Sequence, residues 1–247
     1  NFTLLHDDIM DNAPIRRGEP TVHEKWSLNA AILSGDTMLV QSYQMVAESP
    51  ASVLKKVLNV FSEAAIQFCE GQQYDIDFET QSHVQVNEYL KMIEYKTAVL
   101  LAASLKIGAL IGGSSLKDAN HLYDFGRNIG IAFQLKDDLL DIFGDQHKFG
   151  KQLGGDIIVN KKTYLYLQSL IDANEDQLNE LNYWFSSKKL DVVDKVQAVK
   201  SIYFDLDIEN KTNNKIQDYY KKAMHNLLQV SGDTILLEEV AAMIMNR

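Results

Sequence analysis

Residues 114–143, SSLKDANHLYDFGRNIGIAFQLKDDLLDIF, are predicted to form one long helix. The stretch contains no proline, Ser114 or Ser115 is a suitable N-terminal cap, and the helical pattern ends near Phe143. On a helix, residues i and i+4 share a face, and residue i+1 is turned by about 100°. The D-D-x-x-D motif of this stretch therefore points at least two carboxylates the same way; it consists of Asp137, Asp138 and Asp141.

The same motif occurs near the start of the chain as Asp7, Asp8 and Asp11. Clustered carboxylates destabilise a helix unless a cation or a proton neutralises them. One copy alone is most simply an exposed acidic patch. Two copies, both accompanied by basic residues, indicate a site for Mg²⁺ and a polyphosphate, since Mg²⁺ prefers carboxylate oxygens and completes its octahedron with water and phosphate oxygens.

Two facing carboxylate clusters would hold Mg²⁺ against a diphosphate group. Such a clamp stabilises the charge on a departing pyrophosphate, so that an allylic diphosphate can ionise to a carbocation. The carbocation needs dry, apolar walls because water would trap it. A bundle of long helices with an apolar interior provides such walls.

The chain on either side of residues 114–143 is also predicted to be helical. Its 247 residues include only three prolines, none of them after Pro50, which favours long uninterrupted helices. No fixed-period repeat and no strand-like alternation of useful length is present, so the sequence predicts an all-α protein of one domain. Helices are expected at about 1–11, 23–48 with a mild interruption at Gly35, 50–79 and 87–111. Shorter helices are expected after 161, with breaks near 173–174, 186–187, 209–214 and 231–232, and loops at 12–22 and 144–160.

Composition limits the partners and the compartment. The formal charge of −10 disfavours nucleic acid, because polyanions are drawn to basic surfaces. The single Cys69 excludes an internal disulfide and suits a reducing compartment, so a cytoplasmic location is expected. No integral membrane span is expected, since the most apolar region, 98–113, is interrupted by Ser104 and Lys106.

Basic side chains accompany both aspartate motifs. Arg16 and Arg17 follow the first motif, and adjacent arginines suit bidentate contacts to phosphate oxygens. Lys96 and Thr97 interrupt an otherwise apolar helix, while Lys151 and Lys161 flank the glycine-rich loop beyond the second motif. Taken alone, the arginine pair is better explained as a solvated turn and Lys151 and Lys161 as solubilising surface lysines, while a snorkelling side chain explains Lys96 equally well. Their significance comes from their place beside the motifs.

In their order along the chain, these motifs resemble those of the trans-isoprenyl diphosphate synthases, the polyprenyl synthetase family. Residues 4–23, LLHDDIMDNAPIRRGEPTVH, are similar to the first aspartate-rich region of the family. Residues 133–141, FQLKDDLLD, with Gly144-Asp145 and Gly150-Lys151, are similar to the second region. Between them, residues 71–75, GQQYD, and Lys96-Thr97 match two further motifs, so the resemblance covers essentially the whole chain.

The resemblance implies the isoprenoid synthase type I fold, a bundle of long antiparallel helices around a central cavity, in a homodimer. It implies that residues 1–247 form one such domain and that an N-terminal segment with part of the isopentenyl site precedes it. The implied enzyme is a Mg²⁺-dependent prenyltransferase that condenses isopentenyl diphosphate head-to-tail with dimethylallyl, geranyl or farnesyl diphosphate. Its steps are allylic ionisation, attack by the isopentenyl double bond and loss of a proton to pyrophosphate.

The resemblance also implies roles for individual residues. All six motif aspartates belong to the metal site, with Asp7, Asp11 and Asp137 as direct ligands and Asp8, Asp138 and Asp141 acting through water. The allylic diphosphate is expected to contact Arg16, Lys96, Lys151 and Lys161. Arg17 is expected to contact isopentenyl diphosphate, and Thr97, Gln72 and Gln134 to line the cavity. The residues most directly involved in catalysis would be Asp7, Asp8, Asp11, Lys96, Asp137 and Lys151.

Product length is expected to depend on Phe2 and Thr3, about one helical turn before Asp7. An aromatic ring at this level acts as a floor for the growing chain in the family. Phe2 beside the small Thr3 therefore suggests an all-trans product of C15 to C20. The alternative is that Phe2 only packs against a neighbouring helix and the floor lies deeper.

Two other functions remain open from the sequence. A class I terpene cyclase shares the fold and the first motif, but usually carries an Asn/Ser/Glu metal motif in place of a second D-D-x-x-D. A non-catalytic subunit of a heteromeric synthase tends to lose the aspartates, whereas all six are present in this chain.

Overall fold

A computed structural model of the chain describes residues 2–144, 154–186 and 191–246. In these ranges the prediction of an all-α fold is confirmed. The helices are α1 Phe2–Met10, α2 Val22–Lys25, α3 Leu28–Ala47, α4 Leu54–Thr80, α5 Val86–Ile93, the π-helix η1 Glu94–Ala98, α6 Val99–Ile111, α7 Leu116–Phe143, α9 Gly155–Ile158, α10 Tyr164–Asp172, α11 Glu175–Ser186, α12 Val192–Asp205, α13 Ile208–Leu227 and α14 Ile235–Met245. The two short strands β1 Ile15–Arg16 and β2 Glu19–Pro20 pair antiparallel.

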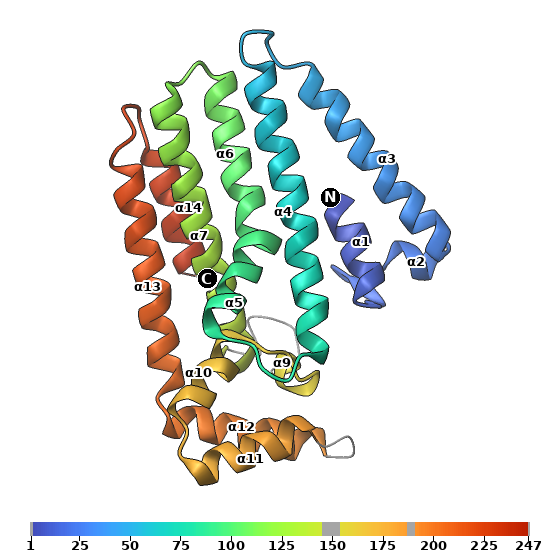
Figure 1. Ribbon diagram of the computed structural model, residues 1–247, viewed down its shortest axis with the longest axis vertical. Coiled ribbons are helices and arrows are strands. Elements are labelled where there is room, and N and C mark those ends of the chain that lie inside the picture. The colour runs from blue at the N-terminus through green and yellow to red at the C-terminus, as the bar shows by residue number, and fades with distance from the viewer. Residues whose placement is uncertain (1, 145–153, 187–190, 247) are drawn as a thin grey trace.

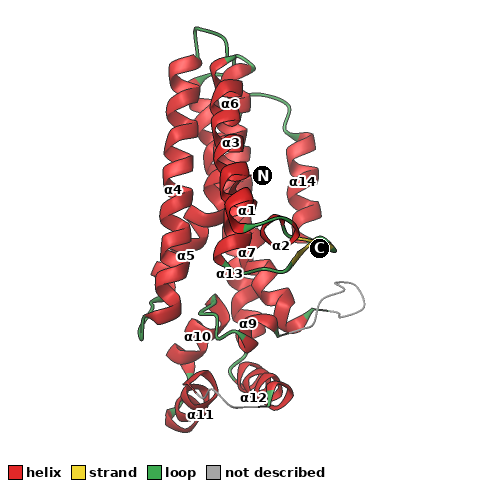
Figure 2. Ribbon diagram, turned by 90° about the vertical axis from the view of Figure 1, so that its right-hand side faces the viewer, coloured by secondary structure: helices red, strands yellow, loops and turns green. Residues whose placement is uncertain are grey.

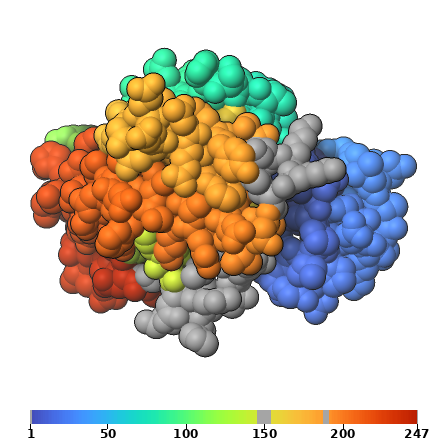
Figure 3. Space-filling model, turned by 90° about the horizontal axis from the view of Figure 1, so that it is seen from below, coloured from blue at the N-terminus to red at the C-terminus, as the bar shows by residue number. Residues whose placement is uncertain are grey.

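The long helices α3, α4, α6, α7 and α13 run along the long axis of the molecule (Figure 1). α7 packs against α6 on one side and α13 on the other, and α1 packs against α3. α11 and α12 lie across one end of the bundle (Figure 2), and a view from that end shows them over its centre, with α1 to α3 to one side (Figure 3).

The helix that carries the second motif begins and ends as predicted. Ser115 caps α7 by accepting a hydrogen bond from the backbone nitrogen of Asp118, and the helix continues without interruption to Phe143. Its backbone lies directly against η1, since a Cβ atom on Gly130 would be 2.7 Å from the Cα atom of Ala98. This close contact fixes the second motif relative to the segment that carries Lys96.

The largest hydrophobic cluster lies immediately behind the second motif. It joins α5, α7, α10, α12 and α13, and its members with at most 1% exposure include Tyr89, Leu135, Leu165, Tyr203 and Ile208. Burial of one such side chain contributes about 1.5–3 kcal/mol. The second motif is therefore carried by one of the best-packed parts of the fold.

Three local predictions are corrected by the structure. α3 runs through Gly35, which faces the His6 ring of α1, and the break falls earlier, between α2 and α3. The break expected at 209–214 is wrong, because α13 is continuous and the chain turns at Asp207, whose φ is +57°. The loop expected at 12–22 contains the β1–β2 hairpin, with positive φ at Arg17 and Gly18 in its turn.

In the described part of the chain, no helix is both long and apolar enough to cross a membrane.

Candidate active site

The first aspartate motif lies at the C-terminal end of α1, where the β1–β2 hairpin folds back onto it. The hairpin places Arg16 Nε 2.7 Å from Asp8 Oδ1 and Arg16 Nη2 3.5 Å from Asp7 Oδ2. The positive φ values at the hairpin turn direct the chain back, so that Arg16 reaches the helix that precedes it. The arginine thus neutralises two of the three motif carboxylates.

Lys96 approaches the same motif from η1. Its Nζ atom lies 2.6 Å from Asp75 Oδ2 of α4 and 3.3 Å from Asp7 Oδ1 of α1. Burial alone would lower the pKa of Lys96, but Asp75 and Asp7 outweigh it and raise the pKa above its usual range. Lys96 therefore remains charged and joins three helical segments at one point.

The π-helical segment is in direct contact with α4. A Cβ atom on Gly71 would lie 2.4 Å from the backbone nitrogen of Lys96 and 2.7 Å from the backbone carbon of Tyr95. Only glycine allows this approach. Single π-helical turns inside α-helices are frequent at functional sites, and here the turn presents Lys96 and Thr97.

The second motif connects to the other predicted cavity residues by hydrogen bonds. Asp138 is 2% exposed and accepts hydrogen bonds from the Tyr89 hydroxyl and, at 3.1 Å, from Gln134 Nε2. Gln134 Oε1 in turn accepts one from Thr97 Oγ1 at 3.2 Å. The structure thus brings Thr97, Gln134 and Asp138 together.

Asp141, one turn after Asp137, contacts the start of α9. Its Oδ2 accepts a hydrogen bond from the Asp156 backbone nitrogen at 3.0 Å, and its backbone oxygen accepts one from Gly154 at 2.7 Å. The side chain of Asp137 is half-buried. Lys151, which the sequence also places near this motif, lies outside the described residues.

Asp156 and Lys161 form an acid–base pair at the edge of the site, with Lys161 Nζ 3.9 Å from Asp156 Oδ1. Burial is the main reason why the pKa of Asp156 is raised to about 7; Lys161 opposes this effect, while Asp138, Asp141 and Asp75 add to it. Burial alone would lower the pKa of Lys161, but the charge of these carboxylates, led by Asp156, raises it. Lys161 therefore stays protonated among acidic neighbours.

Asp11, Asp75, Lys96, Asp156 and Lys161 meet at a pocket of about 630 Å³, within the range of small-molecule sites, whereas the second-motif aspartates do not line it. The pocket is lined by Asp11, Asp75, Phe78, Glu79, Lys96, Asp156, Val159, Asn160, Lys161 and Lys162. Lys162 also donates hydrogen bonds to the Phe78 and Gln81 carbonyls at the end of α4. First-motif and α9 residues thus share one cavity.

The carboxylates suit Mg²⁺ chemically, although they are paired with cations in this structure. No group of three or more His, Cys, Asp or Glu side chains among the described residues is close enough to hold a metal ion. Asp7 Oδ1 is nevertheless buried and accepts no hydrogen bond from these residues, despite lying 3.3 Å from Lys96 Nζ. Burial and the charge of Asp7 also raise the pKa of Asp11. The donor set therefore fits a hard divalent cation.

The predicted floor residues lie in a separate apolar pocket of about 220 Å³. Phe2 and Thr3 of α1 face α4 and α6 there. Its remaining lining residues are Phe61, Ala64, Ala65, Leu100, Ala103, Ser104 and Ile107. Gln72 of α4 is buried, and neither atom of its amide group has a hydrogen-bond partner among the described residues.

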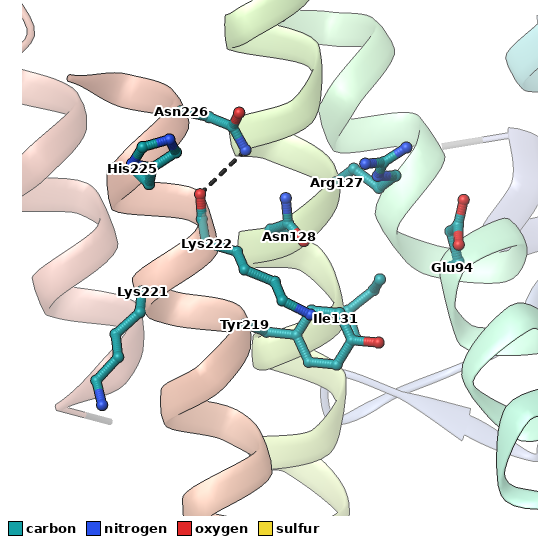
Figure 4. Close-up of a pocket in the computed structure, with 9 residues that line it drawn as sticks. All are labelled: Glu94, Arg127, Asn128, Ile131, Tyr219, Lys221, Lys222, His225 and Asn226. Atoms are coloured by element: carbon teal, nitrogen blue, oxygen red, sulfur yellow. Dashed lines mark hydrogen bonds between the residues drawn. The ribbon is translucent and has the colours of Figure 1, made fainter. Parts of the chain in front are cut away.

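A third pocket, of about 690 Å³, contains none of the predicted site residues. Figure 4 shows Arg127, Asn128 and Ile131 of α7 beside Tyr219 and Lys222 of α13. Arg127 is paired with Asp124 at 3.1 Å, and Lys222 lies 4.9 Å from the centre of the Tyr219 ring. Arg127 and Lys222 thus have partners within the protein.

Several residues of the site were not singled out from the sequence, among them the pocket-lining Phe78, Glu79, Val159, Asn160 and Lys162. Asp75 was noted only as part of the residues 71–75 motif, Tyr89 carries no local signal, and Asp156 follows Gly154-Gly155 in a basic, glycine-rich stretch. Asp156 could have been found from the sequence as a carboxylate within a glycine-rich segment, because such segments bring the backbone close to a ligand.

Comparison with known proteins identifies the family. The family model described as polyprenyl synthetase matches residues 1–203. The chain is 39% identical over 239 residues to the geranylgeranyl diphosphate synthase of Sulfolobus acidocaldarius, which covers 94% of the chain and 71% of that relative. It is 46% identical over 172 residues to the geranylgeranyl diphosphate synthase of Methanosarcina mazei, and this match covers 68% of the chain and 53% of that relative.

The fold agrees with solved structures as well. One geranylgeranyl pyrophosphate synthase superimposes with a TM-score of 0.93 at 42% identity, over 100% of this chain and 77% of that one. The geranylgeranyl pyrophosphate synthetase of Pyrococcus horikoshii Ot3 superimposes with a TM-score of 0.92 at 35% identity, over 100% of this chain and 76% of that one. The chain thus spans about half to three quarters of the length of these relatives. The predicted family is confirmed, and the chain belongs to the polyprenyl synthetases.

Proposed function

We propose that this chain condenses isopentenyl diphosphate head-to-tail with an allylic diphosphate to give an all-trans prenyl diphosphate of C15 to C20. The observation that carries the proposal is the 630 Å³ pocket, where Lys96 and Lys161 meet Asp11, Asp75 and Asp156. Charged groups of both signs at one cavity suit a metal–diphosphate complex.

The metal of this reaction is Mg²⁺, held directly by Asp7, Asp11 and Asp137, with the other three motif aspartates supporting it. When bound, Mg²⁺ neutralises the charge that develops on the departing pyrophosphate. Arg16 and Lys96 both lie within 3.5 Å of the Asp7 carboxylate, so the two cations are placed where they would contact a diphosphate bound beside the metal.

The cationic side chains hold the allylic diphosphate. Lys96 and Lys161 line the pocket, Arg16 approaches from the hairpin, and Lys151 follows the second motif. Arg17, at the hairpin turn, contacts isopentenyl diphosphate. Thr97, Gln134 and Gln72, which do not line the 630 Å³ pocket, would contact the substrates beside the reacting groups. After ionisation and attack by the isopentenyl double bond, the released pyrophosphate accepts the proton.

The test is a product assay on the natural full-length protein. It is incubated with isopentenyl diphosphate and dimethylallyl, geranyl or farnesyl diphosphate, with Mg²⁺ or with EDTA, and the dephosphorylated products are separated by chromatography. Mg²⁺-dependent C15 or C20 alcohols are expected. Cyclic hydrocarbons formed without isopentenyl diphosphate would identify a terpene cyclase instead, and no turnover with any primer would identify a non-catalytic subunit.

Phe2→Ala is expected to shift the products to longer chains, because it removes the ring that closes the apolar pocket between α1, α4 and α6. The measurement is the chain-length distribution by chromatography. Phe204→Ala, at an aromatic that is 77% exposed on α12, is the matched control and should leave the distribution unchanged. Identical distributions for Phe2→Ala and the native protein would mean that the floor lies elsewhere.

We further propose that residues 1–247 act as one domain within a cytoplasmic homodimer. Support for a dimer comes from the exposed apolar side chains of α3, namely Leu28, Leu33, Val40 and Met45. Light scattering of the purified protein is expected to give twice the mass of the chain, and a monomer mass at micromolar concentration would contradict the proposal.

A further inference from the structure

Each carboxylate oxygen of Asp138 accepts a hydrogen bond from a side chain of the protein. Tyr89 of α5 donates its hydroxyl hydrogen to Oδ2, and Gln134 donates from Nε2 to Oδ1 at 3.1 Å. Asp138 is 2% exposed and Tyr89 is 1% exposed. A buried carboxylate is tolerated only when such hydrogen bonds replace its lost hydration.

The hydrogen bonds continue from Asp138 through Gln134 to Thr97, the residue after the pocket-lining Lys96. A carboxylate only accepts hydrogen bonds, so Gln134 must turn its NH₂ group toward Asp138 and its oxygen toward Thr97. The Thr97 hydroxyl donates to that oxygen at 3.2 Å. Asp138 thereby determines which end of the Gln134 amide faces η1, where Lys96 and Thr97 lie.

We propose that Tyr89 is a positioning residue of the active site, which holds Asp138 as the centre of a buried Tyr89–Asp138–Gln134–Thr97 network. In this role Asp138 orients the Gln134 amide and is not itself a direct ligand of the metal. The inference rests on the proposed function, since it concerns residues that would line the substrate cavity.

The position of Tyr89 explains why this role falls to it. α5 leads directly into η1, so the Tyr89–Asp138 hydrogen bond ties the segment before Lys96 to the helix that carries the second motif. The two residues are 49 positions apart in the chain. Loss of the hydroxyl would leave one buried oxygen of Asp138 without a donor and allow the carboxylate to turn.

The test compares Tyr89→Phe with Tyr203→Phe. Both hydroxyls belong to tyrosines that are 1% exposed in the same hydrophobic cluster, but Tyr203 is hydrogen-bonded to Ser169, which is not a predicted site residue. We expect Tyr89→Phe to lower kcat by about 10- to 100-fold, the usual effect of removing a residue that orients a ligating or catalytic group. Tyr203→Phe should stay within about twofold of the native kcat while losing similar thermal stability.

A double-mutant cycle with Asp138→Asn distinguishes an effect of Tyr89 through Asp138 from a general destabilisation of the fold. If Tyr89 acts through Asp138, adding Tyr89→Phe to Asp138→Asn should lower kcat by less than about twofold further, because the two residues act as one unit. Multiplicative effects of the two substitutions would overturn the proposal. So would Tyr89→Phe and Tyr203→Phe variants with the same kcat.

Titration calorimetry with inorganic pyrophosphate and Mg²⁺ supplies a readout that does not depend on turnover. Tyr89→Phe should bind this complex about tenfold more weakly than the native protein, and Tyr203→Phe should bind it equally well. If the native protein makes no prenyl product but these affinities differ as expected, the proposed function falls and the positioning role stands. If the native protein does not bind pyrophosphate with Mg²⁺, or the affinities are equal, the positioning role is overturned.

Discussion

Asp7→Asn is expected to lower the kcat of prenyl transfer by a factor on the order of 10²–10³, the scale of losing one group that stabilises transition-state charge. Asp7 contacts both Arg16 and Lys96, and its buried Oδ1 atom accepts no hydrogen bond from the described residues. An asparagine amide has the same shape but carries no charge to hold Mg²⁺. Steady-state kinetics over a range of Mg²⁺ concentrations measure the effect.

The same substitution should change the free energy of unfolding by less than about 1 kcal/mol. Arg16 retains Asp8 at 2.7 Å, and Lys96 retains Asp75 at 2.6 Å, so neither cation is left unpaired. Asp36→Asn is the matched control, since Asp36 is an exposed aspartate of α3 that pairs with His6 at 3.6 Å and does not line the pocket. Native-like kcat in Asp7→Asn would remove Asp7 from the metal site.

Gly71→Ala is expected to lower both stability and activity. The added methyl group would lie 2.4 Å from the backbone nitrogen of Lys96, so α4 and η1 must separate. Such overpacking costs about 1–3 kcal/mol of unfolding free energy. It would also move Lys96 away from Asp7, and we expect kcat to fall at least tenfold because small displacements of positioned groups cost about 10²-fold.

Gly108→Ala, at another helical glycine, is expected to raise stability where Gly71→Ala lowers it. No atom lies within 4 Å of the added methyl group, so the variant should gain about 0.4–1 kcal/mol by restricting the unfolded chain. Denaturant unfolding of both variants measures the difference. A Gly71→Ala protein as stable and as active as Gly108→Ala would contradict the close contact between α4 and η1.

Local patterns were sufficient to predict the helices and the residues that carry the two motifs. The extent of α7 followed from an N-terminal cap and the absence of proline, and both features depend only on residues close in the sequence. The wrong prediction of a break at 209–214 also came from relying on residues close in the sequence. Its polar residues favour a break locally, but the buried Ile208, Thr212 and Ile216 share one face of α13 and keep the helix intact.

The hydrogen-bonded and ionic contacts of the site could not be predicted in this way. Lys96 meets Asp75 across 21 positions, and Tyr89 meets Asp138 across 49, so neither pair leaves a periodic signal. Which aspartate of a D-D-x-x-D motif points into the core depends on how the helix is rotated against its neighbours. For α7, that rotation buries Asp138 and leaves Asp137 and Asp141 half-buried.

The π-helical turn Glu94–Ala98 has a consequence for insertions and deletions in this helix. A π turn corresponds to one residue added to an α-helix. Deleting one residue there would restore regular α-helical winding and rotate all preceding side chains by about 100° relative to those that follow. Tyr89 would then leave Asp138 while Val99 and Ala102 kept their packing in α6. Homologous chains that differ by one residue in this segment should therefore differ in catalytic geometry even where their folds superimpose.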